Sequence, residues 1–344
     1  MKSLLRILVL LALLLVGFFY INHTDDAPDS IKGPDKTLPK TEAPTMNTDV
    51  MPRPQEGWST YIGESAKTIT DKLGEPIRKG PSAYGFEWWV YHADQQYILV
   101  GVEKNKVKQV FLTGEHVDAQ PFKIGQSIDE LYRNTITDTE INIKIADSIF
   151  TLMLSEVDLQ SRLLVMYDGV LAQLYFDHTT KQLQGIRFID GETLVKQKPY
   201  DMTYVGTIIE PEKLSSFTQE KINAENAKQL FELTNIFRAY NNLDQFTYSE
   251  ELNKVTNQQL KNIVMDRLAK IDSADTDLEQ VLKKNEVDFE QASENIAENY
   301  SDAVDAVSGF INSEKHRKDL LQSNYNIVGT SAFEKNYAQI FIEK

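Results

Sequence analysis

Two polar stretches near the C-terminus carry residue types that could do chemistry together. ENIAENY covers residues 294–300 and NSEKHR covers residues 312–317, so Glu294 and His316 are about one helix apart in the chain. A carboxylate beside an imidazole can act as a general acid–base pair or supply two ligands to a metal ion. No positioned nucleophile accompanies them. A structural reading therefore stays open, in which Glu294 accepts hydrogen bonds that tie a strand to a helix.

Composition limits the classes of function. The chain has 344 residues, enough for two domains, and its net charge is -15. This charge argues against binding to nucleic acid, which requires a basic face to displace counterions from phosphates. The chain contains no cysteine. Disulfides, thiolate metal sites and a cysteine nucleophile are therefore excluded.

The N-terminus predicts export. Lys2 and Arg6 flank the start of an uncharged run at 7–21, and an acidic, polar stretch follows it. This charge order predicts that the N-terminus stays in the cytoplasm and that the rest crosses the membrane. No small-x-small cleavage site follows the run, so residues 1–21 are predicted as an uncleaved single-pass anchor. A cleaved signal peptide and secretion is the alternative.

The region between the anchor and residue 56 predicts a spacer. Residues 22–56 contain many prolines, few large apolar residues and no hydrophobic period. Such a segment buries too little surface to repay its ordering entropy. We expect a stiff linker that holds the following domains away from the membrane.

Residues 57–200 predict a strand-rich domain of two similar units. IGES at 62–65 and IGQS at 124–127 each precede a short helical pattern, where the serine can serve as an N-cap, and several strand-like runs follow. Gly74 predicts the end of the first helix, while EKNK at 103–106 and YDG at 167–169 predict hairpin turns. The aromatic run at 86–91 is either core or the wall of a ligand groove.

Residues 215–344 predict helices followed by an antiparallel hairpin, an α+β arrangement. Three helical patterns bury one face each, and Gln259 falls on the apolar stripe of the second. The third pattern begins at Ser301 or Asp302 and runs through Leu321. The final pattern predicts two strands joined at EKN, residues 334–336.

The C-terminal part of the sequence resembles a known family, the CAP superfamily. This family includes cysteine-rich secretory proteins, insect antigen 5 and plant pathogenesis-related proteins. The resemblance covers about residues 225–344, and the preceding domain resembles the CAP-associated N-terminal domain. The matching positions are Asn235 and Arg238 for Asn-x-x-Arg, SENI at 293–296 for Gly-Glu-Asn-Ile, SEKHR at 313–317 for Ser-Pro-Gly-His-Arg, and Tyr337, Gln339 and Phe341 for the terminal strand. The resemblance implies a C-terminal α-β-α sandwich.

The resemblance also implies a cleft in which many members hold a divalent metal with two histidines and two acids. Glu294 and His316 match one acid and one histidine, whereas Gln259 and Ser313 stand at the other two positions. Two protein ligands would bind zinc only weakly, because a zinc site usually has three or four protein donors. The neutral amide of a glutamine suits calcium better than zinc. The expected cleft residues are Gln259, Glu294, Asn295, His316, Arg317 and Gln339.

One further calcium pattern is discounted. The stretch at 275–286 has acids at positions 1, 3, 5 and 12 of a calcium-loop count, but it lacks the glycine at position 6 and contains Lys283 and Lys284. A solvated acidic helix or loop is the better interpretation.

Together these features predict a membrane-anchored binding module on the outside of a bacterial cell, whose partner is an envelope ligand or a protein. Two alternatives stay open. One is a metal-assisted hydrolase that uses Glu294 and His316, and the other is a purely structural envelope protein. The family is functionally diverse, so the fold does not decide among them.

Overall fold

A computed structural model describes residues 29–47, 50–93, 96–114, 117–135, 137–269 and 277–344. The predicted anchor at 1–21 lies outside these residues. Within the described ranges, no helix combines the length and the apolar character that a membrane span requires.

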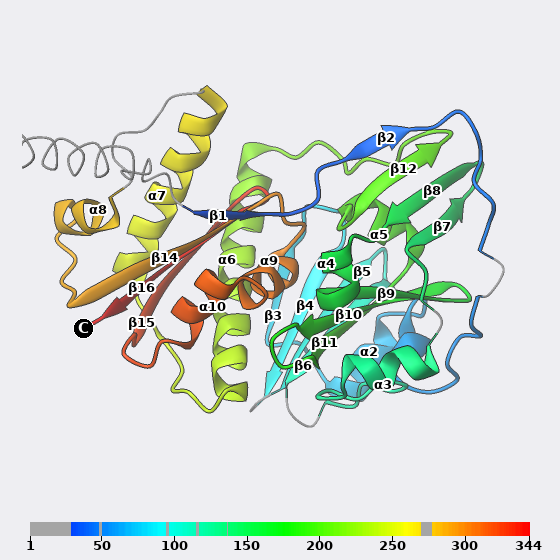
Figure 1. Cartoon of the computed structure of the whole chain (residues 1–344), viewed down its shortest axis with the longest axis horizontal. Helices are drawn as coiled ribbons and strands as arrows, with labels where there is room; N and C mark the ends of the chain where they lie inside the picture. Colours follow the sequence, from blue (N-terminus) through cyan, green and yellow to red (C-terminus); the bar gives the residue numbers. More distant parts are fainter. Residues whose placement is uncertain (1–28, 48–49, 94–95, 115–116, 136, 270–276) are drawn as a thin grey trace, which may run out of the picture.

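A five-stranded sheet forms the centre of the C-terminal domain (Figure 1). Its strand order is β1-β14-β16-β15-β13, and the predicted terminal hairpin is the antiparallel pair β15–β16. Glu334 makes the turn with φ of +55°, as predicted for EKN. The strands are β1 (Ser30–Lys32), β13 (Thr247–Tyr248), β14 (Gln291–Glu298), β15 (Ile327–Phe333) and β16 (Asn336–Glu343).

Helices cover both faces of this sheet and confirm the α-β-α sandwich. Successive side chains of a strand point to opposite faces. On β16, Tyr337 and Phe341 pack with the helices of one layer, whereas Ile340 and Ile342 pack with the other. The first layer is α6 (Ser216–Tyr240), α9 (Ala303–Ile311) and α10 (Glu314–Leu321), and the second is α7 (Glu250–Ala269) and α8 (Leu278–Lys284).

Two of the predicted helical patterns differ in the structure from the prediction. The pattern from 301 to 321 forms two helices, because Asn312 donates and accepts hydrogen bonds with Phe176 and His178 of the preceding domain and ends α9. On α7, Leu268 is 74% exposed although it continues the apolar stripe. The calcium-like stretch forms α8, capped by Asp277, over its described part.

The N-terminal domain contains the two predicted units, but they share one sheet. The seven-stranded sheet has the order β3-β4-β5-β6-β11-β10-β9, so strands of the first unit pair with strands of the second at β6–β11. Its strands are β3 (Arg78–Pro81), β4 (Glu87–Ala93), β5 (Gln96–Glu103), β6 (Lys106–Gly114), β9 (Arg162–Tyr167), β10 (Val170–Asp177) and β11 (Gln182–Ile189).

A four-stranded sheet, β2-β12-β8-β7, completes this domain together with short helices. Its strands are β2 (Thr37–Pro39), β7 (Glu140–Ile145), β8 (Ser148–Met153) and β12 (Asp201–Val205). The helices are η1 (Trp58–Tyr61), α2 (Lys67–Leu73), α3 (Ile128–Asn134), α4 (Glu156–Ser161) and α5 (Gly191–Gln197).

Most of the helix ends that were predicted from local capping residues are confirmed. Ser127 accepts the backbone N–H of Glu130, and Gly74 ends α2 with φ of +80°. Asp302, rather than Ser301, caps α9 by accepting the N–H of Asp305. The cap predicted at Ser65 is wrong by one position, because Ala66 is the N-cap of α2.

The segment expected to be an unstructured linker contains two strands. We call residues 29–40 the strap, because β1 pairs in parallel with β14 of the C-terminal domain and β2 pairs in parallel with β12 of the N-terminal domain. Figure 1 shows this blue segment running along both domains. Three-residue pairings depend on the neighbouring strand, so no local pattern predicted them.

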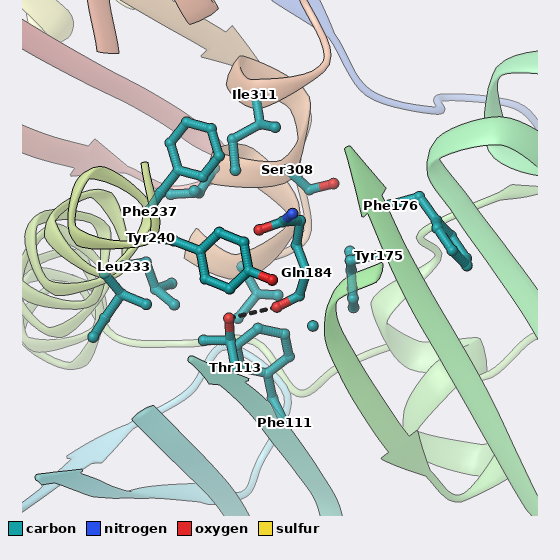
Figure 2. A pocket seen from close by; sticks show the side chains of 14 residues that line it. Phe111, Thr113, Tyr175, Phe176, Gln184, Leu233, Phe237, Tyr240, Ser308 and Ile311 are labelled. Atoms are coloured by element: carbon teal, nitrogen blue, oxygen red, sulfur yellow. Dashed lines mark hydrogen bonds between the residues drawn. The ribbon is translucent and has the colours of Figure 1, made fainter. Parts of the chain in front are cut away.

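The two domains share a hydrophobic core. Trp88 and Phe111 of the N-terminal sheet pack in one cluster with Leu233 of α6 and Phe310 of α9. The aromatic run at 86–91 is therefore mainly core. Figure 2 shows the cavity left in this contact, between Phe111 and Tyr175 on one side and Phe237 and Ile311 on the other. Its volume of about 50 Å³ is far below the ~300 Å³ of the smallest usual ligand sites.

Ion pairs cross the same interface. The guanidinium of Arg187 donates two hydrogen bonds of 2.8 Å to the carboxylate of Asp302, and both side chains are almost completely buried. Arg78 forms ion pairs with Glu225 and Glu232 of α6. These contacts fix the orientation of one domain on the other.

Candidate functional site

His316 lies in the first turn of α10 and is only 1% exposed. Its Nε2 lies 3.2 Å from the carbonyl oxygen of Asp29, and its Nδ1 lies 2.7 Å from Oγ of Ser313. A carbonyl can only accept, so Nε2 carries the proton and Nδ1 accepts from the serine hydroxyl. Burial lowers the pKa of His316. The imidazole is therefore neutral at pH 7, with both nitrogens engaged.

The strap covers this corner of the C-terminal domain. Ser30 pairs with Ile296 of β14, and the N–H of Gly33 donates to the carbonyl of Glu298 at 2.8 Å. Lys315 adds an ion pair of 3.2 Å to Asp29. The predicted acid–histidine corner is thus closed by the chain's own N-terminal segment.

Glu294 lies on β14 and does not pair with His316. Asn295 points toward α10, so strand alternation directs Glu294 to the opposite face. Glu294 makes no hydrogen bond or ion pair with any residue in the described ranges. Burial raises its pKa to about 7, and the charge of Lys315 opposes this rise. Of the predicted pair, Glu294 is therefore the group whose pKa lies near neutrality with no hydrogen-bond partner among the described residues.

Replacing Glu294 with glutamine is expected to stabilise the protein at pH 8 but not at pH 4.5. The folded-state pKa of about 7 exceeds the unfolded value of 4.5. The native state therefore loses stability as the pH rises through this window. We expect Glu294→Gln to raise the free energy of unfolding by about 1–3 kcal/mol at pH 8. Urea titrations at both pH values test this, and an equal effect at both would contradict it.

The other predicted cleft residues serve packing. Asn295 Nδ2 donates to the carbonyl of His316 at 3.0 Å, and its cross-strand neighbour Gln339 donates to Thr234 of α6 at 2.6 Å. Arg317 points to the other domain, where it forms an ion pair of 2.8 Å with Asp177. The structure therefore brings Asn295, His316 and Gln339 together as ties between sheet and helices.

Gln259 instead lines a separate cavity of about 540 Å³ between α7 and α8. It is 5% exposed, and its Nε2 has no hydrogen-bond partner among the described residues. Sequence reasoning identified its inward orientation but missed the cavity. The signal was the amide run NQQ at 257–259, continued by Asn262 one turn later. Five amide side chains line it, together with Asp266 and Lys284: Gln258, Gln259, Asn262, Gln280 and Asn285.

These residues do not fit a divalent metal. Both nitrogens of His316 are engaged by protein groups, and Gln259 lines a cavity that His316 does not border. Over the described ranges, no group of three histidines or acids could hold a metal ion. Amides both donate and accept hydrogen bonds without carrying charge, so the cavity suits uncharged polar groups.

Comparison with known proteins matches both domains. Residues 62–200 match the model "CAP-associated N-terminal", and residues 231–340 match "Cysteine-rich secretory protein family". The uncharacterized membrane protein YlbC of Bacillus subtilis is 33% identical over the full length of both chains.

Two solved structures share the whole architecture. An extracellular protein containing an SCP domain from Bacillus anthracis is 33% identical, with a TM-score of 0.78 over 89% of this chain and 99% of that chain. A cysteine-rich secretory protein from Staphylococcus aureus is 26% identical, with a TM-score of 0.79 over 92% of this chain and 98% of that chain. Sequence, domain order and fold agree, and the chain belongs to the cysteine-rich secretory protein (CAP) family, as a member with a CAP-associated N-terminal domain.

Proposed function

We propose that this protein is a non-catalytic binding module, anchored in the cell membrane with both domains outside, that holds an uncharged polar ligand of the cell envelope. The charge order around residues 7–21 supports the orientation. Its full-length relative in Bacillus subtilis is named a membrane protein, and its structural neighbour from Bacillus anthracis is described as extracellular.

The observation that carries the proposal is the replacement of acid–base chemistry by amides. The family histidine that remains, His316, uses both ring nitrogens inside the protein. At the position of the missing histidine, Gln259 lines the amide cavity, and its Nε2 has no hydrogen-bond partner in the part of the chain that the structure describes. A buried amide without a partner costs free energy, which a ligand that accepts its hydrogen bond would recover.

A hydrolase is the second candidate, because the pKa of Glu294 near 7 suits a general acid or base. It would require a substrate that reaches Glu294 and a second group that the described residues do not place beside it. The purely structural role predicts no saturable ligand binding, so that substitutions in the amide cavity are silent.

The test is co-sedimentation of the full chain with insoluble cell-wall sacculi, together with an assay for soluble fragments. We expect saturable binding without fragment release. Gln259→Leu should weaken binding about tenfold yet fold normally, since it removes an unpaired buried amide. Gln160→Leu, at an exposed glutamine of α4, is the matched control.

Each contrary outcome has a defined meaning. Fragment release that disappears in Glu294→Gln would establish the hydrolase. Sacculus binding that Gln259→Leu retains would remove the amide cavity as the site, and no binding of the wild-type chain would favour the structural role.

A further inference from the structure

A second feature of comparable size lies between the domains, under the strap. It is a cavity of about 480 Å³, within the ~300–1,000 Å³ range of sites for small ligands. Three parts of the chain line it: the strap at Ile31–Asp35, the N-terminal domain around α4 and β12, and the C-terminal domain around Tyr300 and α9. It shares no lining residue with the amide cavity between α7 and α8.

The inner wall of this cavity is prebuilt and charged. Arg162 lies 2.9 Å from Asp158 and 3.6 Å from Asp305 across the domain interface. It is 7% exposed, and its Nε has no hydrogen-bond acceptor among the described residues. The guanidinium is thus held by two carboxylates and retains one unpaired donor.

Other polar groups of the lining are uncommitted. The hydroxyls of Tyr300 and Ser308 line the cavity and donate no hydrogen bond to a described residue, although Ser308 also borders the small apolar cavity of Figure 2. The side chains of Lys32 and Asp35, both exposed on the strap, likewise have no described hydrogen-bond or ion-pair partner. These four groups are available to a ligand without breaking any contact.

The mixture of groups selects the chemistry of the ligand. Carboxylates only accept hydrogen bonds, and lysine and arginine only donate them. A hydroxyl does both, so a polyhydroxylated molecule can pair with each without carrying charge. Ile31, Met153 and Val157 add apolar surface for its C–H faces. Four carboxylates against two basic groups in the lining, with a chain net charge of -15, disfavour a polyanion.

We propose that this interdomain cavity is a binding site for a short, uncharged glycan. The strap forms its outer wall and is held at both ends, by β1–β14 and by β2–β12. Gly33 lies close against the backbone just after β14, since a methyl group added there would come within 2.4 Å of the carbonyl oxygen of Asn299. The site therefore exists only when both domains and the strap are docked.

The test is calorimetric titration of the full chain, in a detergent whose headgroup contains no sugar. The probes are cellotetraose, the β-1,4-linked N-acetylglucosamine tetramer, and a glycerol phosphate oligomer of similar length. We expect at least one of the two uncharged tetramers to bind with a dissociation constant below about 1 mM, and the phosphate oligomer not to bind.

Variants locate the site. Asp35→Asn and Tyr300→Phe should each weaken binding about three- to tenfold, while Gln259→Leu in the other cavity should leave it unchanged. Val157→Trp, at a residue 70% exposed on the cavity rim, should block entry without disturbing the core. Equal melting temperatures of the variants show that they fold.

Several results would overturn the proposal. They are the absence of binding of both uncharged tetramers, preferential binding of the phosphate oligomer, or glycan binding that Tyr300→Phe and Val157→Trp retain. Glycan binding lost only in Gln259→Leu would assign the ligand to the amide cavity instead. That outcome would support the proposed function while refuting this second site.

Discussion

Replacing Asp302 with asparagine is expected to lower the free energy of unfolding by about 3–5 kcal/mol. The carboxylate accepts two hydrogen bonds of 2.8 Å from Arg187 of the other domain. Asparagine can still cap α9, as Asp302 does through the N–H of Asp305. The variant therefore removes the charge that pairs directly with the fully buried guanidinium of Arg187, while the charge of Asp305 stays nearby.

Two spectroscopic probes report the domains separately. The three tryptophans, Trp58, Trp88 and Trp89, all lie in the N-terminal domain. Among the described residues, the two longest helices are α6 and α7 of the C-terminal domain, and they contribute strongly to the far-ultraviolet circular dichroism. In urea, we expect the two probes to coincide for the wild-type chain and to separate in Asp302→Asn, because the interface then no longer couples the domains.

The control is the double variant Arg187→Met/Asp302→Asn. Removing both charges eliminates the unpaired guanidinium, so at least half of the lost stability should return. A loss below about 1 kcal/mol in the single variant would show that the pair behaves like an exposed salt bridge. Coincident probes in that variant would show that apolar packing alone couples the domains.

The sequence predicted most elements whose signals are local. Ser127, Gly74 and Asp302 act at the ends of their helices as the capping rules require, and the two predicted hairpin turns, at 103–106 and 167–169, contain residues with positive φ. Such signals depend on a few neighbouring residues. These signals can therefore be identified without any knowledge of tertiary structure.

What the sequence did not reveal depends on distant partners. The strap has no periodicity, and its strands form only because β14 and β12 present open edges. The state of His316 was equally hidden, since Asp29, which accepts its Nε2 proton, lies 287 residues earlier. Likewise, Asn312 ends α9 through contacts with the other domain.

For the candidate site, the sequence predicted the orientation of one side chain but not the cavity that it lines. The helical period of α7 correctly placed Gln259 inward, at 5% exposure. That period could not show that α8 leaves an amide-lined space beside it, because the placement of α8 follows from its packing through Leu282 on Leu252 and Val255. The interdomain cavity lies between elements that are distant in sequence, and the amide cavity lies between two consecutive helices whose separation is set by tertiary packing.

Arg238→Met is expected to cost about 3–5 kcal/mol of stability, comparable to the loss of an interdomain ion pair. The guanidinium donates to the carbonyls of Asp244, Leu320 and Gln322 at 2.7, 2.8 and 3.0 Å. It also lies 3.9 Å from the centre of the Phe246 ring. Methionine keeps the aliphatic packing but leaves three carbonyls without a donor.

Arg238→Lys separates charge from geometry. An ammonium group keeps the charge but cannot reach all three carbonyls with the planar fork of arginine, so about half of the loss should persist. Circular dichroism in urea measures both variants. Wild-type stability in Arg238→Lys would show that charge alone suffices. The other motif residue, Asn235, likewise bonds both backbone groups of Phe246. The expected result would therefore mean that the Asn-x-x-Arg motif holds the loops after α6 and α10 against α6. A motif with that role would persist in family members of any function, including one whose metal cleft is gone.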